Sequence, residues 1–167
     1  MRSEFFDVVN AADEVIDRKP RAEVHQLGLL HRAVHVLVFN SRGQVFLQKR
    51  SRTKDRQPGL WDTSASGHVD AGEDYDAAAM RELREELGIA ECTPQKRLFK
   101  LHACAETDNE FVWVYQCEYD GPISLNTDEI ETGAWFEPAF VTRWVADRPQ
   151  DFASTFKLIW ARLAAQR

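Results

Sequence analysis

The stretch from Gly67 to Ile89 constrains the fold more than any other part of the chain; it reads GHVDAGEDYDAAAMRELREELGI. Glu82, Glu85 and Glu86 fall at i, i+3 and i+4, so on a helix they share one face. Like charges at this spacing repel each other and destabilise the helix. A bound divalent cation would offset that repulsion. Carboxylate oxygens are hard ligands that suit Mg²⁺ or Mn²⁺.

Local signals delimit the helix that carries these glutamates, and we predict it from about Asp74 to Leu87. Acidic residues at its start are favoured by the helix dipole, and Gly88 stands where a left-handed C-cap is expected. Gly67 and Gly72 permit a tight loop that leads from a strand into the helix. The expected apolar stripe consists of Ala79, Met80, Leu83 and Leu87.

The remainder of the chain reads as strands followed by helices. Without a steady βαβ alternation, this order favours an α+β fold. The Pro58-Gly59 pair predicts that residues 51 to 66 form a loop. Strands are expected at residues 5–9, 34–40, 45–49, 97–105, 111–119 and 131–136, and helices at 138–146 and 152–165.

Composition narrows the classes of protein that fit. A length of 167 residues with 44% hydrophobic residues predicts one domain with a substantial core. The net charge of −6 argues against a general nucleic-acid or membrane-surface binder. No run reaches transmembrane length, and the first residues lack the apolar region of a signal peptide. Three cysteines without CxxC spacing indicate free thiols, and a cytoplasmic protein is predicted.

The stretch from Gly67 to Ile89 also matches a named pattern, the Nudix box G-x5-E-x7-R-E-U-x-E-E-x-G-U, where U is a bulky aliphatic residue. All fixed positions are filled, by Gly67, Glu73, Arg81, Glu82, Leu83, Glu85, Glu86, Gly88 and Ile89. The chain therefore resembles the Nudix family of diphosphate hydrolases. The resemblance implies an α/β/α sandwich around a mixed sheet. It also implies a single Nudix domain over residues 1–167, with a core of about 30–165 and an N-terminal β extension.

A second resemblance covers roughly residues 5 to 140. This region is similar to the branch of the family that contains isopentenyl-diphosphate isomerase. The isomerase binds a metal mainly through histidines and later carboxylates. The resemblance implies counterparts at His25, His31, His68, Asp108 and Glu110, with Asp108 standing where the isomerase has a glutamate. The features that carry the resemblance are His31, Lys49-Arg50, Lys54, Pro58-Gly59, Trp61 and Gly67-His68.

Two positions depart from the isomerase pattern. Ser66 stands where the isomerase has an acid/base cysteine, and a hydroxyl is a much weaker proton donor than a thiol. Glu82 stands where the isomerase has a basic residue. The hydrolase box is intact, so we favour an Mg²⁺-dependent hydrolase, with Mn²⁺ as a second option. The expected substrate is a small-molecule diphosphate, a nucleoside di- or triphosphate or related nucleotide conjugate. An isomerase-like enzyme is the alternative.

The resemblance to Nudix hydrolases assigns roles to the box residues. Glu82, Glu85 and Glu86 would hold the metal, and Arg81 would orient the glutamates by ion pairing, with Glu73 in support. Glu82 or Glu85 is the first candidate for the general base that activates water. Glu129 or Glu131, ahead of the last expected strand, is the alternative.

Other residues are expected to contact substrate. Arg50, Lys54, His68 and Gly67 form the expected substrate-binding set. Trp61 and Phe111 have two interpretations, stacking on a nucleotide base or packing in the core, and the second is the more frequent fate of aromatic residues. The sequence leaves the oligomeric state open.

Overall fold

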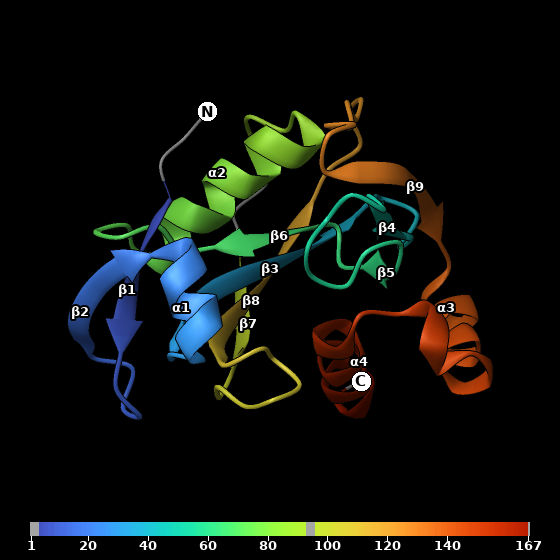
Figure 1. Cartoon of the computed structure of the whole chain (residues 1–167). Helices are drawn as coiled ribbons and strands as arrows, with labels where there is room; N and C mark the ends of the chain where they lie inside the picture. The colour runs from blue at the N-terminus through green and yellow to red at the C-terminus, as the bar shows by residue number, and fades with distance from the viewer. Residues whose placement is uncertain (1–3, 93–95, 167) are drawn as a thin grey trace.

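The structure is a computed structural model and describes residues 4–92 and 96–166. A seven-stranded mixed sheet forms its centre (Figure 1). β3 and β8 pair in parallel along their whole length, and the other pairings are antiparallel. The sheet order is β5-β4-β3-β8-β7, with β6 added to β3 and β9 to β4. The strands are β3 (His31–Phe39), β4 (Val45–Arg50), β5 (Trp61–Asp62), β6 (Ala65–His68), β7 (Lys96–Leu101), β8 (Glu110–Glu118) and β9 (Ile130–Phe136).

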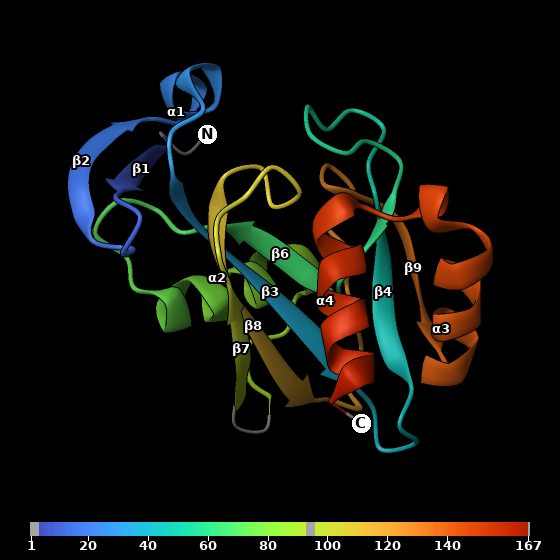
Figure 2. The same cartoon turned by 90° about the horizontal axis from the view of Figure 1, so that it is seen from below.

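Helices cover both faces of this sheet, as the predicted α/β/α sandwich requires. α2 (Tyr75–Leu87) packs on one face, and α3 (Pro138–Asp147) and α4 (Ser154–Ala165) pack on the other, with the short 3₁₀ helix η1 (Pro149–Asp151) between them (Figure 2). Successive residues of a strand point to opposite faces, so β3 contributes to both cores. Its residues Val34, Val36 and Val38 face α2, and Ala33, Leu37 and Phe39 face α4.

The box helix forms as predicted. Asp74 is its N-cap, and the side chain accepts a hydrogen bond from the backbone N–H of Ala77. Gly88 adopts the left-handed conformation at the C-cap, with a φ of 68°. Ala79, Leu83 and Leu87 are buried as expected, whereas Met80 is only partly buried.

The chain begins with a hairpin and a helix outside the main sheet: β1 (Phe5–Val9), β2 (Val15–Pro20) and α1 (Arg21–Leu27). β1 was predicted, but β2 and α1 were not. β2 is mostly exposed and charged, and α1 is only seven residues long, so neither carries a clear hydrophobic period. The turn residue Asp13 ties the hairpin to the sheet, because its side chain accepts from Arg32, Tyr75 and Lys100.

The prediction of a loop over residues 51–66 is wrong in part. β5 lies within it, and β6 begins at Ala65 and pairs with β3 from Val36 back to Ala33. The sequence Ala-Ser-Gly-His has weak strand propensity, so tertiary pairing decides its conformation. Gly67 accordingly lies inside β6 rather than in a loop. Among the described residues, no helix has the length and apolar character needed to cross a membrane.

Candidate active site

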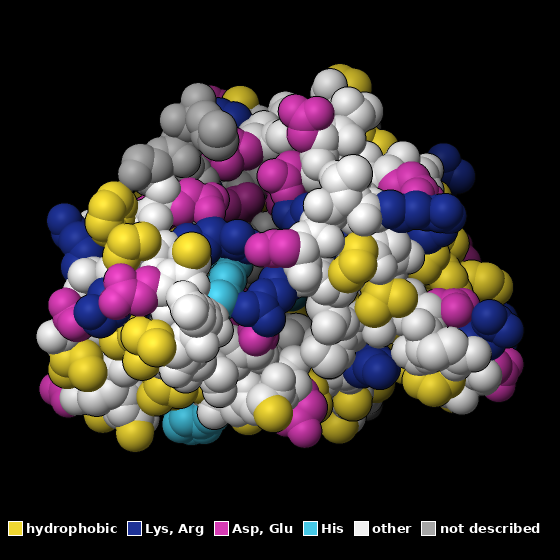
Figure 3. All heavy atoms as spheres, in the orientation of Figure 1, with side chains coloured by type: hydrophobic (Ala, Val, Ile, Leu, Met, Phe, Trp, Pro, Cys, Tyr) yellow, Lys and Arg dark blue, Asp and Glu magenta, His cyan; other side chains and the backbone are white. Residues whose placement is uncertain are grey.

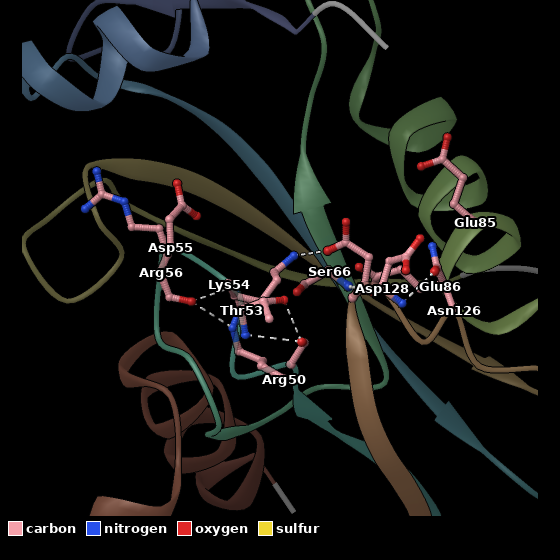
Figure 4. A network of polar contacts seen from close by, with 12 residues as sticks. Arg50, Thr53, Lys54, Asp55, Arg56, Ser66, Glu85, Glu86, Asn126 and Asp128 are labelled. Atoms are coloured by element: carbon pink, nitrogen blue, oxygen red, sulfur yellow. Dashed lines mark hydrogen bonds and ion pairs between the residues drawn. The ribbon is translucent and has the colours of Figure 1, made fainter. Parts of the chain in front are cut away.

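Two glutamates of α2 are buried against β6. Glu86 accepts hydrogen bonds from the backbone N–H of Ser66 at 3.0 Å and from the Gln48 side chain at 2.9 Å. Glu82 is likewise buried, whereas Glu85 is exposed and projects from α2 apart from Glu86 (Figure 4). We call Glu82, Glu85 and Glu86 the glutamate cluster. All three border the cleft, but their environments differ.

The box glycine allows this close approach of helix and strand. A Cβ atom at position 67 would collide with the carboxylate of Glu82. The conformation of Gly67 does not demand glycine, because its φ is not positive. A larger residue at position 67 would therefore push the Glu82 carboxylate out of its place beside β6.

Arg81 connects the box residues to one another. Its Nε donates to Glu73 Oε2 at 2.8 Å, and its Nη1 donates to Glu82 Oε1 at 2.6 Å. Nη2 donates to the backbone carbonyl of His68 at 2.9 Å, and Glu85 Oε2 lies 3.3 Å from Nη1. The geometry matches the ion pairing predicted for Arg81 and the supporting position predicted for Glu73.

The glutamate cluster is electrostatically strained without a cation. Burial, with the nearby charge of Glu86, raises the pKa of Glu82 well above its ordinary value, even though Arg81 opposes the shift. Burial also raises the pKa of Glu86, to about 7, although hydrogen bonds from Ser66 and Gln48 favour its charged form. A hard divalent cation would stabilise both carboxylates in their charged forms, so the residues present fit such an ion.

A second group of potential ligands lies at the ends of other elements. His25 comes from α1, His31 from the start of β3, His68 from the end of β6 and Glu110 from the start of β8. One ligand atom from each residue falls within 4.8 Å of the others. We call these four residues the histidine cluster. Glu110 Oε2 lies 2.8 Å from His68 Nε2 and 3.2 Å from His31 Nε2.

The histidine cluster fits a metal ion by its chemistry. The Nε2 atom of His25 is buried and has no hydrogen-bond partner, which is costly for a polar atom. Burial, with the charges of neighbouring groups, lowers the pKa of His25 to about 4, which keeps a neutral, ligating form. Burial would raise the pKa of Glu110, but His68 and His31 hold it far below its ordinary value. Three imidazoles and a carboxylate suit Zn²⁺ or Mn²⁺ better than Mg²⁺.

Asp108, the fifth residue suggested by the isomerase resemblance, lies at the edge of this cluster. Its Oδ2 is 3.9 Å from His25 Nε2, and its Oδ1 is 3.4 Å from the guanidinium of Arg56. Asp108 therefore stands between the histidine cluster and the β4–β5 loop.

The glutamate cluster lines a cleft of about 530 Å³, and the histidine cluster reaches it through His68 and Glu110. Acidic, basic and histidine side chains gather there below α2 (Figure 3). The β4–β5 loop, residues 51–60, forms another wall. Lys54 of this loop forms an ion pair with Glu129, and Arg50 at the end of β4 donates to the backbone carbonyl of Arg56 at 2.8 Å (Figure 4). Arg50 also lies 3.4 Å from the buried carboxylate of Asp62. Arg50, Lys54, His68, Gly67 and Glu129 thus all line the cleft.

Other predicted residues lie elsewhere. Glu131 pairs with Lys49 at 3.1 Å and with Arg52 at 3.0 Å, outside the cleft lining. Phe111 is buried, and Trp61 packs against Phe136 and Trp144, so the core-packing interpretation holds for both.

Several cleft residues were missed by sequence reasoning. Gln48 does not line the cleft but supports Glu86 from behind it; it interrupts the apolar alternation of β4, and a buried polar residue in a strand could have flagged it. Arg56, Asn126 and Asp128 sit in irregular segments and give no periodic signal, so their position depends on the fold alone.

The arrangement of a box helix, a mixed sheet and a glutamate cluster in an open cleft defines a class of protein. The family model described as the NUDIX domain matches residues 29–155, and the chain belongs to the Nudix family. It is 34% identical to the isopentenyl-diphosphate Delta-isomerase of Serratia proteamaculans, over 97% of this chain and 98% of that protein. It is 35% identical to YfcD of Escherichia coli K12, an uncharacterized Nudix hydrolase, over 84% and 77% of the two chains. The crystal structure of DR0079 from Deinococcus radiodurans is similar, with a TM-score of 0.84, 29% identity and 95% and 98% coverage.

Proposed function

We propose that this Nudix protein is an Mg²⁺-dependent hydrolase that cleaves a diphosphate linkage in a nucleoside di- or triphosphate or a related nucleotide conjugate. The observation that carries the proposal is the buried pair Glu82 and Glu86 beside β6, with Glu82 linked through Arg81 to Glu85. Two neighbouring buried carboxylates with raised pKa values are unfavourable unless a cation joins them.

The glutamate cluster would hold the metal, with Glu82 and Glu86 as inner ligands and Glu85 at the open side. A divalent ion there would neutralise phosphate oxygens and acidify the attacking water. Arg81 fixes the side chain of Glu82, and Glu73 fixes Arg81 in turn. Lys54 and Arg50 lie on the opposite wall, where they would bind the phosphates of the substrate.

The general base is assigned to Glu85 first. Glu85 is more exposed than Glu82 and Glu86 and borders the cleft, so it can reach a water molecule. Glu129 is the alternative on the opposite wall. It is paired with Lys54 in this structure and would accept a proton once that lysine turns to a phosphate.

An isomerase-like reaction is the second candidate, favoured by the histidine cluster and by the isomerase relative. His25, His31 and His68 meet as the isomerase resemblance implies. Ser66 opposes this reaction because a hydroxyl is a poor proton donor compared with a thiol. Glu82 opposes it as well, since it completes the hydrolase box.

A substrate screen with purified protein and Mg²⁺ tests the proposal, with product phosphates followed by ³¹P NMR. The panel contains nucleoside di- and triphosphates, sugar nucleotides and isopentenyl diphosphate. We expect cleavage of at least one nucleotide and loss of that cleavage in Glu85→Gln. Conversion of isopentenyl to dimethylallyl diphosphate without phosphate release would instead establish the isomerase reaction.

A further inference from the structure

We infer that the end of the cleft away from the glutamate cluster binds a neutral, hydroxyl-rich group of the substrate, such as a sugar, rather than a prenyl tail, a stacked base or a further phosphate. The inference rests on the proposed function, because it concerns the group attached to the diphosphate. This end of the cleft is formed by the β4–β5 loop, the β7–β8 loop and the start of α4.

The first observation is what the cleft wall lacks. Among the described residues, no Phe, Tyr, Trp, Leu, Ile, Val or Met side chain lines the cleft, and its apolar contribution comes from three alanines. A prenyl tail gains affinity by burying apolar surface, and a nucleotide base gains it by stacking on an aromatic ring. Four aromatic residues next in sequence to lining residues, Trp61, Phe111, Phe152 and Phe156, pack in the protein interior instead.

The second observation is charge. Eleven Asp and Glu residues line the cleft against four Lys and Arg residues. The cations at this end are already paired, Arg21 with Asp55 at 2.9 Å and Arg56 with Asp108 at 3.4 Å. An additional phosphate here would have to compete with these carboxylates for the two cations, whereas a neutral group would not.

The third observation is the kind of hydrogen-bonding group on offer. Ser154 Oγ and Thr155 Oγ1 donate to the backbone carbonyl of Glu106, at 2.7 Å and 3.1 Å. Their protons are committed, so their oxygens are left as acceptors toward the cleft. The carboxylate of Asp108 is a further acceptor. A wall rich in acceptors selects donors, and sugar hydroxyls are donors whereas phosphate oxygens and alkyl chains are not.

A binding comparison with the full-length protein and Mg²⁺ tests this directly. Ribose 5-phosphate and n-pentyl phosphate have the same number of carbon atoms and the same phosphate but differ in their hydroxyl groups. We expect ribose 5-phosphate to bind at least about tenfold more tightly by isothermal titration calorimetry, since several hydrogen bonds each contribute modestly. Equal affinities, or tighter binding of the pentyl ester, would overturn the inference.

A substitution at the start of α4 tests where the hydroxyl groups of the ligand bind. Thr155→Val removes one acceptor with little change in shape, and we expect it to reduce the affinity ratio about three- to tenfold. Thr132→Val is the matched control, because Thr132 is exposed on β9 and outside the cleft lining. An unchanged ratio in a folded Thr155→Val protein would place the hydroxyl groups elsewhere and refute the inference. The two proposals fail separately: an absence of cleavage across the diphosphate panel contradicts the hydrolase, whereas cleavage without a preference for ribose 5-phosphate contradicts only this inference.

Discussion

The glutamate cluster and the histidine cluster share one cleft but are built in different ways. The glutamates all come from one helix, within two turns, and offer oxygen only. The four residues of the histidine cluster come from four elements and offer mainly nitrogen. On a helix, the spacing in the sequence alone decides which residues share a face. The glutamate cluster can therefore be recognised in the sequence as a short motif. The histidine cluster exists only when α1, β3, β6 and β8 are assembled.

The two clusters also differ in how their charges are balanced. In the glutamate cluster, burial and like charges raise the pKa values of Glu82 and Glu86. In the histidine cluster, the contacts with His68 and His31 lower the pKa of Glu110 despite its burial. The first cluster needs an external cation, whereas the second is already partly neutralised by its own histidines. We therefore expect the two clusters to respond differently to substitution, metal and pH.

The largest difference is expected in catalysis. Glu85→Gln should lower kcat/KM for diphosphate hydrolysis by roughly 10²–10⁴, the usual contribution of a general base. His68→Asn should lower it less than about tenfold, because the proposed chemistry takes place at the glutamate cluster. Steady-state kinetics on the best substrate of the screen measure both. Thermal unfolding of the two variants controls for folding. A greater loss of kcat/KM in His68→Asn than in Glu85→Gln would indicate that the reaction takes place at the histidine cluster.

The two clusters should also differ in the metal ions that they bind. Zn²⁺ or Mn²⁺ should bind the histidine cluster, and His25→Ala should weaken that binding by about 10²-fold or more, since a ligand with an otherwise unpartnered nitrogen is lost. Glu86→Gln should leave it nearly unchanged while weakening Mg²⁺ binding. Elemental analysis after dialysis against limiting chelator gives the bound metal. Equal loss in both variants would mean that the two clusters act as one site.

The fold was predictable where hydrophobic periodicity is strong. The box helix, the cores of β3, β4, β8 and β9, and the two C-terminal helices all lie within a few residues of their predicted bounds. β6 escaped prediction because Ser66 and Gly67 carry no strand signal and the strand forms only through its ladder with β3. α1 was not predicted because a seven-residue helix with one buried residue, Val24, has no detectable hydrophobic period.

The candidate site likewise has a part that the sequence predicts and a part that depends on the fold. The positions of Arg81 and Glu73 followed from the motif, since residues eight apart on one loop and helix can meet. The acceptor-rich end of the cleft did not, because Ser154 and Asp108 are 46 positions apart and are brought to one wall by the β7–β8 loop and α4. The exposure that separates Glu85 from its neighbours likewise depends on where β6 packs.

The free energy of unfolding should depend on pH because Glu86 of the glutamate cluster is buried. The folded-state pKa of Glu86 is about 7, above its ordinary value of 4.5, so the folded protein binds this proton more tightly than the unfolded chain. Stability from this group is present at low pH and is lost as pH rises from about 4.5 through 7. At pH 8 with EDTA, Glu86→Gln should therefore be more stable than the unsubstituted protein, by about 1–3 kcal/mol.

Urea unfolding at pH 5.5 and pH 8 measures this difference. The advantage of Glu86→Gln should shrink at pH 5.5, where the buried carboxyl is protonated in the folded state. Added Mg²⁺ should stabilise the unsubstituted protein at pH 8 and leave the variant almost unaffected. A variant that is equally destabilised at both pH values would show that Glu86 is held by hydrogen bonds alone and carries no buried charge.

The smallest expected effect concerns the opposite wall of the cleft. Lys54→Met should raise KM about tenfold with little change in kcat, because one charge-assisted contact to phosphate is removed. The loss of substrate affinity stays at the low end of the range for a charge-assisted contact, since Lys54 must first break its ion pair with Glu129 to reach a phosphate. Arg52→Met is the control: Arg52 is exposed and pairs with Glu131 outside the cleft. A fall in kcat with unchanged KM would instead mean that Lys54 acts by positioning Glu129, which would make Glu129 the base and the β4–β5 loop part of the reaction.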